Sequence, residues 1–488
     1  MRHPSILGPS LLGLAATGLL AVPCGAAILH VNAGLVGGAN DGTSWDNAFV
    51  GVDALANALA ASNNGDQIWV AAGLYRPTAG SSRTISLTLK TGVAVYGGFE
   101  GSEAVLEERD WTANETVLSG DLAENDPLVN DNSYHVVKGG SANATAVLDG
   151  FTIVGGNANG SMTGDNDRGG GALMVTASSA TIRNCRFVGN RCTFGGGAVY
   201  VRQSSPSFTD CSFEENLGGQ FGGAFDIFNV SNPTFTNCFF VGNTAARAGG
   251  VEVFGNCQPK LRNCVFFDNT STGSGGGGAV YVASSSVPQL RNCTIVGNHA
   301  NVNYAGVLST GSTTSIANCV VWGNTGPGGS QAAIQQVAQI GSGSTVVTYS
   351  CVQNGFAGTG NIATDPNLAD QAMGDLHLLS GSPCIDAGSN ALVPAGVTTD
   401  ADGLPRFVDD PDTADTGSGT PPLVDMGAYE FQVAAPCVGD LDRNGTVDGA
   451  DLGLLLAAWG TPGGDLDGSG STDGADLGLL LAAWGGCR

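Results

Sequence analysis

A short phrase recurs six times between residues 184 and 324 of this chain of 488 residues. It begins with a polar residue and Cys, and it continues with a large apolar residue two positions after the Cys and Asn five positions after it. Successive copies lie 26, 27, 26, 29 and 26 residues apart, a period that indicates a solenoid. The six cysteines are Cys185, Cys211, Cys238, Cys264, Cys293 and Cys319.

A second phrase, Gly-Gly-Ala or a close variant, keeps the same period. Between residues 196 and 216 the chain contains a β-rich run, a Ser-Ser-Pro turn and an alternating run. Each turn therefore holds at least two short strands. Parallel stacking of the turns, about 4.8 Å apart, buries one continuous apolar interior. The second phrase ends at Ala172, Ala198, Ala224, Val251, Ala279 and Val307.

The first 27 residues have the features of a secretory signal peptide. Arg2 is followed by an apolar stretch over residues 6–22 and by small residues that predict cleavage after Ala26 or Ala27. We therefore expect an extracellular or cell-surface protein. No later segment has about 20 uninterrupted apolar residues, so no membrane span is expected. A formal net charge of −25 argues against nucleic acid as a partner and favours cations.

The repeated Cys shares a strand face with the apolar residue two positions later. This placement predicts a buried stack of free thiols that behave as small hydrophobic side chains. Disulfides or metal binding remain alternatives, because exported proteins commonly form disulfides. The repeated Asn also predicts a structural stack, since Asn tolerates left-handed turns and its amide can hydrogen-bond to the next turn. These residues are Asn190, Asn216, Asn243, Asn269, Asn298 and Asn324.

The two phrases together resemble right-handed parallel β-helix proteins, especially the repeats of polymorphic outer-membrane and adhesin-like proteins. Residues 29–76 look like the start of such proteins, in which a short helix, here around residues 52–61, covers the open end. Residues 365–389 and 424–431 resemble their closing segment. The resemblance implies an all-β fold, with a right-handed parallel β-helix over residues 28–433 and a small module over residues 434–488.

That module contains two loops offset by 25 residues, each followed by the sequence LGLLLAAW. Oxygen-bearing residues occupy positions one, three, five, seven, nine and twelve around a glycine at position six, which is the pattern of an EF-hand calcium loop. We predict two calcium sites and expect calcium to supply much of the folding free energy of the module. The ligands are Asp440, Asp442, Asn444, Thr446, Asp448 and Asp451, and Asp465, Asp467, Ser469, Ser471, Asp473 and Asp476.

The duplicated loops resemble type I dockerins, and this resemblance implies a cohesin or another surface protein as partner. The tenth and eleventh loop positions of dockerins frequently carry hydroxyl groups at the cohesin contact. Here they are Gly and Ala in both loops, which puts a cohesin in doubt. Cys437 and Cys487 bracket the module and predict a disulfide, with free thiols or intermolecular pairing as alternatives.

Many right-handed β-helices degrade polysaccharides, so the resemblance also raises the question of catalysis. The chain has neither the Gly-His-Gly motif with clustered Asp of polygalacturonases nor the set of acids and Arg of pectate lyases. Asp226, Glu252 and Arg247 remain weak candidates for an acid and base cluster across adjacent turns. Tyr200 and Tyr281 are weak candidates for sugar stacking.

Alignment of the second phrase sorts these candidates by strand face. It places Glu252 in a column of apolar residues that face inward. The residues on the opposite face of the strands are then Met174, Tyr200, Asp226, Val253, Tyr281 and Ser309. Scattered surface residues explain the candidates equally well. Two hypotheses follow. One is a non-enzymatic scaffold, adhesin or glycan-binding rod attached through a calcium-dependent tail, and the alternative is a lyase or glycoside hydrolase that acts on an acidic polysaccharide.

Overall fold

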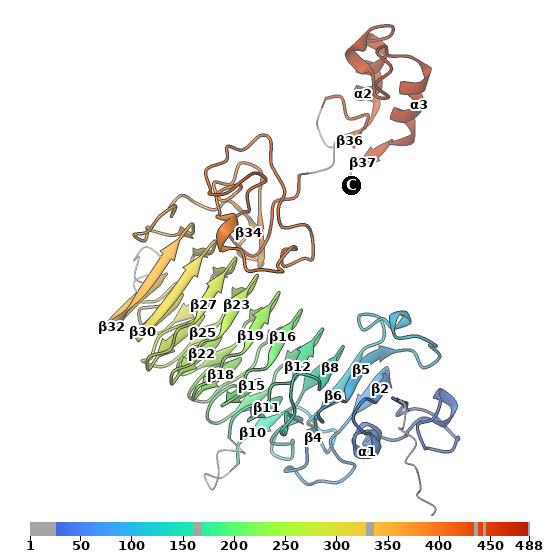
Figure 1. Ribbon diagram of the computed structural model, residues 1–488, viewed down its shortest axis with the longest axis vertical. Helices are drawn as coiled ribbons and strands as arrows, with labels where there is room; N and C mark the ends of the chain where they lie inside the picture. Colours follow the sequence, from blue (N-terminus) through green and yellow to red (C-terminus); the bar gives the residue numbers. More distant parts are fainter. Residues whose placement is uncertain (1–25, 161–167, 328–335, 434–437, 443–445, 487–488) are drawn as a thin grey trace, which may run out of the picture.

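The structure is a computed structural model that describes residues 26–160, 168–327, 336–433, 438–442 and 446–486. Residues 1–25 of the predicted signal peptide, the predicted calcium ligand Asn444, and Cys437 with Cys487 lie outside the described residues. The chain winds into a long stack of parallel strands, and a small helical module follows its C-terminal end (Figure 1). No helix in the described ranges is both long and apolar enough to cross a bilayer.

A full turn of the rod contributes three main strands, as in β15 (Val199–Arg202), β16 (Ser207–Thr209) and β17 (Ser212–Glu214). Each strand pairs in parallel with its equivalents in the turns before and after. The first and second strands of every turn belong to an 18-stranded sheet, and the third strands form a 10-stranded sheet. The solenoid predicted from the repeat is therefore confirmed.

The larger sheet comprises, besides β15 and β16, strands β1 (Ile28–Val31), β2 (Gln67–Ala71), β4 (Leu87–Thr88), β5 (Ala94–Phe99), β7 (Val137–Lys138), β8 (Val147–Asp149), β11 (Leu173–Thr176), β12 (Thr181–Arg183), β18 (Phe225–Phe228), β19 (Thr234–Thr236), β22 (Val251–Phe254), β23 (Lys260–Arg262), β26 (Val280–Ala283), β27 (Gln289–Arg291), β30 (Val307–Ala317) and β32 (Val337–Thr348). The smaller sheet comprises, besides β17, strands β3 (Gly73–Tyr75), β6 (Thr116–Ser119), β9 (Thr152–Val154), β13 (Arg186–Val188), β20 (Phe239–Val241), β24 (Val265–Phe267), β28 (Thr294–Val296), β31 (Val320–Trp322) and β33 (Cys351–Val352). Short strands follow the third strands at β10 (Asn157–Ala158), β14 (Arg191–Cys192), β21 (Thr244–Ala245), β25 (Thr270–Ser271) and β29 (His299–Ala300).

The interior of the rod consists of stacked equivalent side chains. Phe240 stacks on Phe213 and on Phe266, with ring centroids 5.2 and 4.4 Å apart. The six repeated cysteines are free and buried in the same core cluster. The prediction of a thiol stack is thus confirmed, and burial raises the pKa of each of these thiols.

The repeated Asn residues form a continuous buried ladder. The Asn216 side-chain nitrogen donates to Asn243 Oδ1 at 3.0 Å, and Asn243 in turn donates to Asn269 Oδ1 at 2.9 Å. The ladder runs from Asn190 to Asn324 and ends on Gln336. The expectation that these Asn adopt left-handed backbone was wrong. The residue immediately before each of them has positive φ, as do all six polar residues before the repeated Cys.

The N-terminal end is covered by α1 (Ala54–Ala61), as predicted. The helix buries Leu55 and Leu59 in the core cluster that continues into the rod. Short 3-10 helices occur at Trp45–Asn47, Leu106–Glu108, Asn390–Leu392 and Pro462–Gly464. A cap of this kind removes the unpaired edge and the apolar end that an open solenoid would expose to water.

The closing segment, residues 363–431, packs against the outer face of β24, β28 and β31, which are the third strands of the last turns. It contains β34 (Leu368–Asp370) and β35 (Asp375–Leu378). Val265, Val296 and Val320 point outward on their strands and are buried beneath Leu376 and Met426. Because outward Val side chains would be exposed on a bare strand, this coverage explains why these third strands are apolar on both faces.

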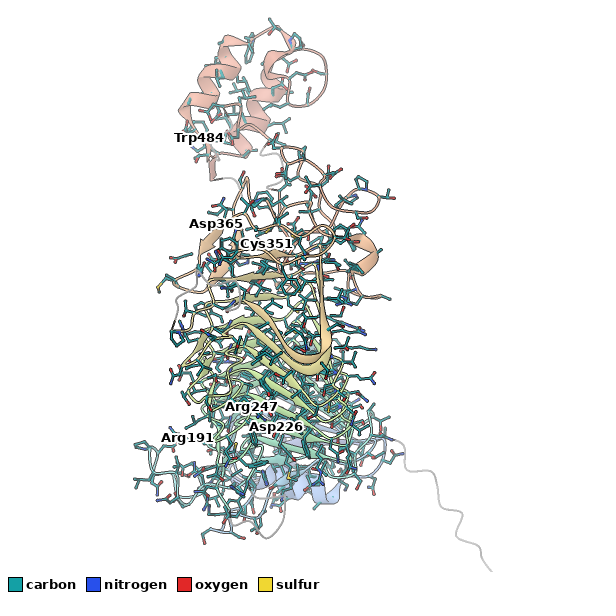
Figure 2. The ribbon with its side chains drawn as sticks, turned by 90° about the vertical axis from the view of Figure 1, so that its left-hand side faces the viewer. Arg191, Asp226, Arg247, Cys351, Asp365 and Trp484 are labelled. Atoms are coloured by element: carbon teal, nitrogen blue, oxygen red, sulfur yellow. The ribbon has the colours of Figure 1, made fainter. Side chains whose placement is uncertain are left out.

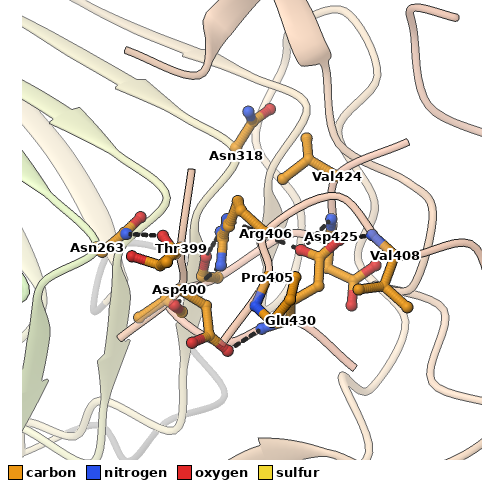
Figure 3. Close-up of polar contacts among 12 residues, drawn as sticks. Asn263, Asn318, Thr399, Asp400, Pro405, Arg406, Val408, Val424, Asp425 and Glu430 are labelled. Carbon is orange, nitrogen blue, oxygen red and sulfur yellow. Dashed lines mark hydrogen bonds and ion pairs between the residues drawn. The ribbon is translucent and has the colours of Figure 1, made fainter. Parts of the chain in front are cut away.

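A buried polar network holds the closing segment together (Figure 3). Arg406 is fully buried and donates to the carbonyl oxygens of Gly427 and Ala428. Glu430 Oε2 lies 3.8 Å from Arg406 Nε and accepts the backbone N–H of Asp425 at 3.1 Å. Burial, together with repulsion from Asp425, raises the pKa of Glu430 to about 9.

The C-terminal module contains two helices, α2 (Gly449–Ala457) and α3 (Gly474–Ala482), and the antiparallel pair β36 (Thr446–Val447) and β37 (Gly485–Gly486). Its small core consists of Val447, Leu455 and Leu480. Asp448 and Asp473, at position nine of the two loops, cap the N-termini of α2 and α3. The predicted order of loop and helix is therefore present in both copies.

Candidate functional site

The strand register corrects the predicted placement of the acid cluster. Glu252 pairs with Asp226 on one side and with Tyr281 on the other, whereas Val253 pairs with Ile227. Gly250 and Gly306 occupy the position that Ala fills in the other copies, so Val251 and Val307 are already inward. Glu252 therefore belongs to the outward row, and it does not interrupt the apolar column. Leu308, and not Ser309, follows Tyr281 in that row, and Ala338 follows Leu308.

Asp226, Glu252 and Arg247 do lie together. Figure 2 shows Asp226 and Arg247 beside each other about half-way along the rod. Arg247 Nε lies 3.1 Å from Glu252 Oε2, and its Nη2 contacts Oε1, so the ion pair is bidentate. The Arg247 guanidinium also lies 4.5 Å from the ring centroids of both Phe221 and Tyr281. The cation is thus held between two aromatic rings and one carboxylate.

Burial dominates the electrostatics of this cluster. Glu252 is 1% exposed, and burial raises its pKa to about 7 against the opposing effect of Arg247. Burial and the charge of Glu252 raise the pKa of Asp226 well above its usual range. Two carboxyls on adjacent turns whose pKa values are both raised by burial are chemically suited to proton transfer.

A loop covers the cluster. Thr270 and Val280 are the equivalents of Thr244 and Val251 in the preceding turn, and the chain between them is three residues longer. The extra residues form part of loop 271–279. The backbone of Gly275 lies so close to Arg247 that an added Cβ would be 2.5 Å from the Arg247 Cγ. The four cavities of about 480, 340, 260 and 270 Å³ on the described part of the chain are lined by residues other than Asp226 and Glu252.

The two candidate tyrosines differ. Tyr200 is 4% exposed and lies against Gly169, so it offers no platform to a sugar and that prediction was wrong. Tyr281 is half-buried, and its ring faces Arg247. Neither residue presents an open aromatic face of the kind that sugar stacking requires.

A separate groove lies on the outer face of the third strands, and sequence reasoning missed it. It has a volume of about 480 Å³ and crosses β9, β13, β17 and β20. One wall is the loop that carries Trp111 and Glu115, and Ala401 of the closing segment belongs to the opposite wall. The groove is the part of this sheet that neither the N-terminal loops nor the closing segment cover. Its sequence signal is the change from outward Arg186 and Ser212 to outward Val265 and Val320 along equivalent positions.

Polar and aromatic side chains line this groove. Trp111 is 41% exposed and packs over the guanidinium of Arg109 at 4.9 Å. Arg186 Nη2 lies 3.0 Å from Glu214 Oε2, and Asn237 donates to Asp210 at 3.0 Å. The carboxylate of Glu214 raises the pKa of Arg186, so this Arg stays a cation and does not act as a base.

In the tail, each of the two predicted calcium loops brings together the carboxylates at positions one, three and twelve. Asp440, Asp442 and Asp451 have oxygens within 4.8 Å of one another, and the second loop repeats this arrangement with Asp465, Asp467 and Asp476. Hydrogen bonds from the backbone, that of Asp448 first, lower the pKa of Asp451, and the equivalent bonds lower that of Asp476. The described donors therefore fit a calcium ion in both loops.

Residues 136–287 and 170–347 match the family described as "Right handed beta helix region". The chain thus contains a right-handed β-helix region, as predicted. The crystal structure of pectate lyase Pel9A has a TM-score of 0.49 and 14% identity with this chain, and the match covers 84% of this chain and 97% of that one. At this level the likeness says nothing about activity. No curated protein matches the chain in sequence.

Proposed function

We propose that this protein is an exported β-helix rod that binds polysaccharide in the groove on its third strands and is attached through a calcium-dependent tail. The groove carries the proposal. Its volume is in the range of small-molecule and oligosaccharide sites. Trp111 supplies an exposed ring for the apolar face of a sugar, and Arg186, Asp210 and Asn237 supply hydrogen-bonding groups for hydroxyls.

The charge of the groove favours a neutral glycan. Glu115 and Asp210 line it together with Arg186, and Glu214 already neutralises the Arg186 guanidinium. The whole chain carries a net charge of −25, which repels a polyanion unless a cation bridges the two. A neutral polysaccharide avoids this cost. Four turns about 4.8 Å apart give a groove long enough for a short oligosaccharide segment.

The test is retention on polysaccharide gels with a matched pair of variants. Trp111→Ala removes the exposed ring, and Trp484→Ala removes a similarly exposed ring from the tail. We expect Trp111→Ala to weaken binding about tenfold, corresponding to about 1.4 kcal/mol, while Trp484→Ala binds like the native protein. Absence of retention on every neutral and acidic glycan tested, or equal loss in both variants, would overturn the proposal.

The second candidate is a polysaccharide-degrading enzyme, favoured by the buried carboxyls Asp226 and Glu252 with their raised pKa values. In that case Glu252 is the residue poised to exchange a proton near neutrality. Formation of unsaturated products or new reducing ends would be followed during incubation with the same glycans. Turnover that is abolished by Glu252→Gln and retained in Trp484→Ala would favour the enzyme over the binding rod.

For the tail, we infer two bound calcium ions and a role in attachment. The ligands are the predicted sets in the two loops, and calcium supplies the positive charge that offsets the clustered carboxylates. Two observations support attachment. The carboxylates already converge in both loops, and α2 and α3 expose an apolar surface that recurs at the same offset of 25 residues, namely Leu454, Leu456, Trp459, Leu479, Leu481 and Trp484. A surface of this kind is suited to a protein partner such as a cohesin.

Calcium-dependent capture tests the attachment role. Full-length protein with immobilised cohesin is compared in CaCl2 and in chelator, with Leu481→Ser and Trp484→Ala as variants of the exposed surface. Binding that needs calcium and is weakened by these variants supports a cohesin partner. Binding that is indifferent to both the chelator and the variants would contradict it.

A further inference from the structure

The closing segment contains a group of carboxylates that belongs to neither the groove nor the tail. Asp386, Asp409 and Asp415 each have one carboxylate oxygen within 4.8 Å of the other two. Asp386 lies in the segment SPCIDAG, whereas Asp409 and Asp415 lie in a separate exposed loop. The group therefore joins two segments that are not consecutive in the chain.

One oxygen of this group is buried and has no partner. Asp386 is 0% exposed, and its Oδ2 accepts the backbone N–H of Asp410 at 3.2 Å. Its Oδ1 has no hydrogen-bond partner. Proteins rarely leave a buried carboxylate oxygen unsatisfied, because the lost hydration is not recovered. The free oxygen thus indicates a ligand that the polypeptide itself does not supply.

Basic residues are missing from the stretch of sequence that contains Asp409 and Asp415. Residues 407–433 contain no Lys, Arg or His. The nearest, Arg406, directs its guanidinium to the carbonyls of Gly427 and Ala428 and to Glu430. Burial first, and then repulsion from Asp409, Asp415 and Asp410, raises the pKa of Asp386 to about 6. A bound cation removes this repulsion.

We propose that Asp386, Asp409 and Asp415 bind one calcium ion that fastens loop 409–415 to the body of the closing segment. Three carboxylate oxygens within 4.8 Å of one another fit a common cation at the calcium–oxygen distance of about 2.3–2.6 Å. Asp409 and Asp415 are exposed, so water completes the coordination. The backbone N–H of Asp386 donates to Asp425 Oδ1 at 2.7 Å, so the ion is linked to the buried network of Figure 3.

The test counts calcium bound to the full-length protein. Native protein, the double variant Asp409→Asn with Asp415→Asn, and the control Asp412→Asn are dialysed against CaCl2 at about 5 mM, above the dissociation constants of about 10⁻⁴–10⁻³ M typical of extracellular sites. Asp412 is an exposed acid in the same loop that lies outside the group. We expect the double variant to bind one ion fewer than the native protein and the control to bind the same number. Equal counts in all three proteins would overturn the proposal.

A second measurement uses the nearly isosteric variant Asp386→Asn. In chelator it should unfold at a higher temperature than the native protein, because it removes an uncompensated buried carboxylate. In CaCl2 the order should reverse, because only the native protein gains from the ion. The same order of unfolding temperatures in both solutions would exclude a cation at this position. Neither result depends on glycan binding, so the two proposals fail or succeed separately.

Discussion

The Asn ladder makes a quantitative prediction about the stability of the rod. Asn243 lies at its centre and is fully buried. Its side-chain nitrogen donates to Phe213 O at 2.8 Å and to Asn269 Oδ1 at 2.9 Å. Its Oδ1 accepts both the backbone and the side-chain N–H groups of Asn216 at 3.0 Å. Replacement by Ala removes all four hydrogen bonds at once.

The expected loss follows from these contacts. A net contribution of about 0.5–1.5 kcal/mol for each hydrogen bond gives about 2–6 kcal/mol, and the sum is an upper range because neighbouring bonds are not additive. The backbone N–H of Asn216 also loses the acceptor in the next turn. We therefore expect Asn243→Ala to lower the free energy of unfolding by about 3 kcal/mol. Asn301→Ala is the control, because Asn301 is exposed and its side chain donates one hydrogen bond, to Thr272 O in the preceding turn.

The assay is urea unfolding of the full-length protein, followed by the β-sheet circular dichroism of the rod. Asn243→Asp adds a sharper comparison, because it keeps the shape but turns the donor nitrogen into a second acceptor that faces Phe213 O and Asn269 Oδ1. This variant should be least damaging at low pH, where the protonated carboxyl can donate one of the lost bonds. If Asn243→Ala and Asn301→Ala differ by less than about 1 kcal/mol, the ladder does not stabilise the rod as argued.

Three further predictions address the acid cluster, the thiols and the tail. Burial raises the pKa of Glu252 from 4.5 to about 7, so its contribution to stability is fully present below pH 4.5 and is lost as the pH rises through 7. The free energy of unfolding of the native protein should therefore fall by about 3 kcal/mol over this range, and Glu252→Gln should not show this fall. Identical pH profiles of unfolding for the two proteins would refute the prediction. The six stacked thiols should resist alkylation in the native protein and react after unfolding in urea, because burial keeps them protonated and inaccessible; mass spectrometry of native protein labelled at Cys238 or Cys264 would contradict this. A calcium chelator should abolish the helical circular dichroism of residues 446–486 while most of the β signal of the rod remains, and simultaneous loss of both would contradict the division at residue 434.

The sequence predicted those parts of the fold in which every turn obeys the same constraint. Inward Phe213 and Phe240, the cysteines and the ladder Asn recur because each must match its equivalents about 4.8 Å away. Helix α1 was also predictable, since an apolar helical run at an open solenoid end has one obvious place to pack. Positive φ was expected at the ladder Asn, but it occurs at the residue before each of them, such as Gly189 and Glu215. Both residues belong to the same tight turn, so the sequence did not distinguish them.

The outward-facing residues were harder to predict. Val251 was aligned with Ala because both follow two glycines, and this shift of one residue moved Glu252 to the wrong face of the strand. Tyr200 was read as exposed from the alternation of the strand, but Gly169 lies against its ring. Similarly, the groove near Trp111 depends on where two distant segments stop covering the third strands. The change from outward Arg186 and Ser212 to outward Val265 and Val320 marks where the coverage begins, but it does not show which segments provide it.

One irregularity in the repeat does locate a functional candidate. The spacing of 29 residues between Cys264 and Cys293 exceeds the others, and strand pairing leaves no room for extra residues within the wall of the rod. They must leave the wall as a loop, and here that loop brings Gly275 against Arg247. Gly275 and the ring of Tyr281 thus both lie against Arg247, the partner of Glu252, and burial raises the pKa of Glu252. In a solenoid, a departure from the period therefore marks the turn at which the outer surface, and with it the chemistry, is altered.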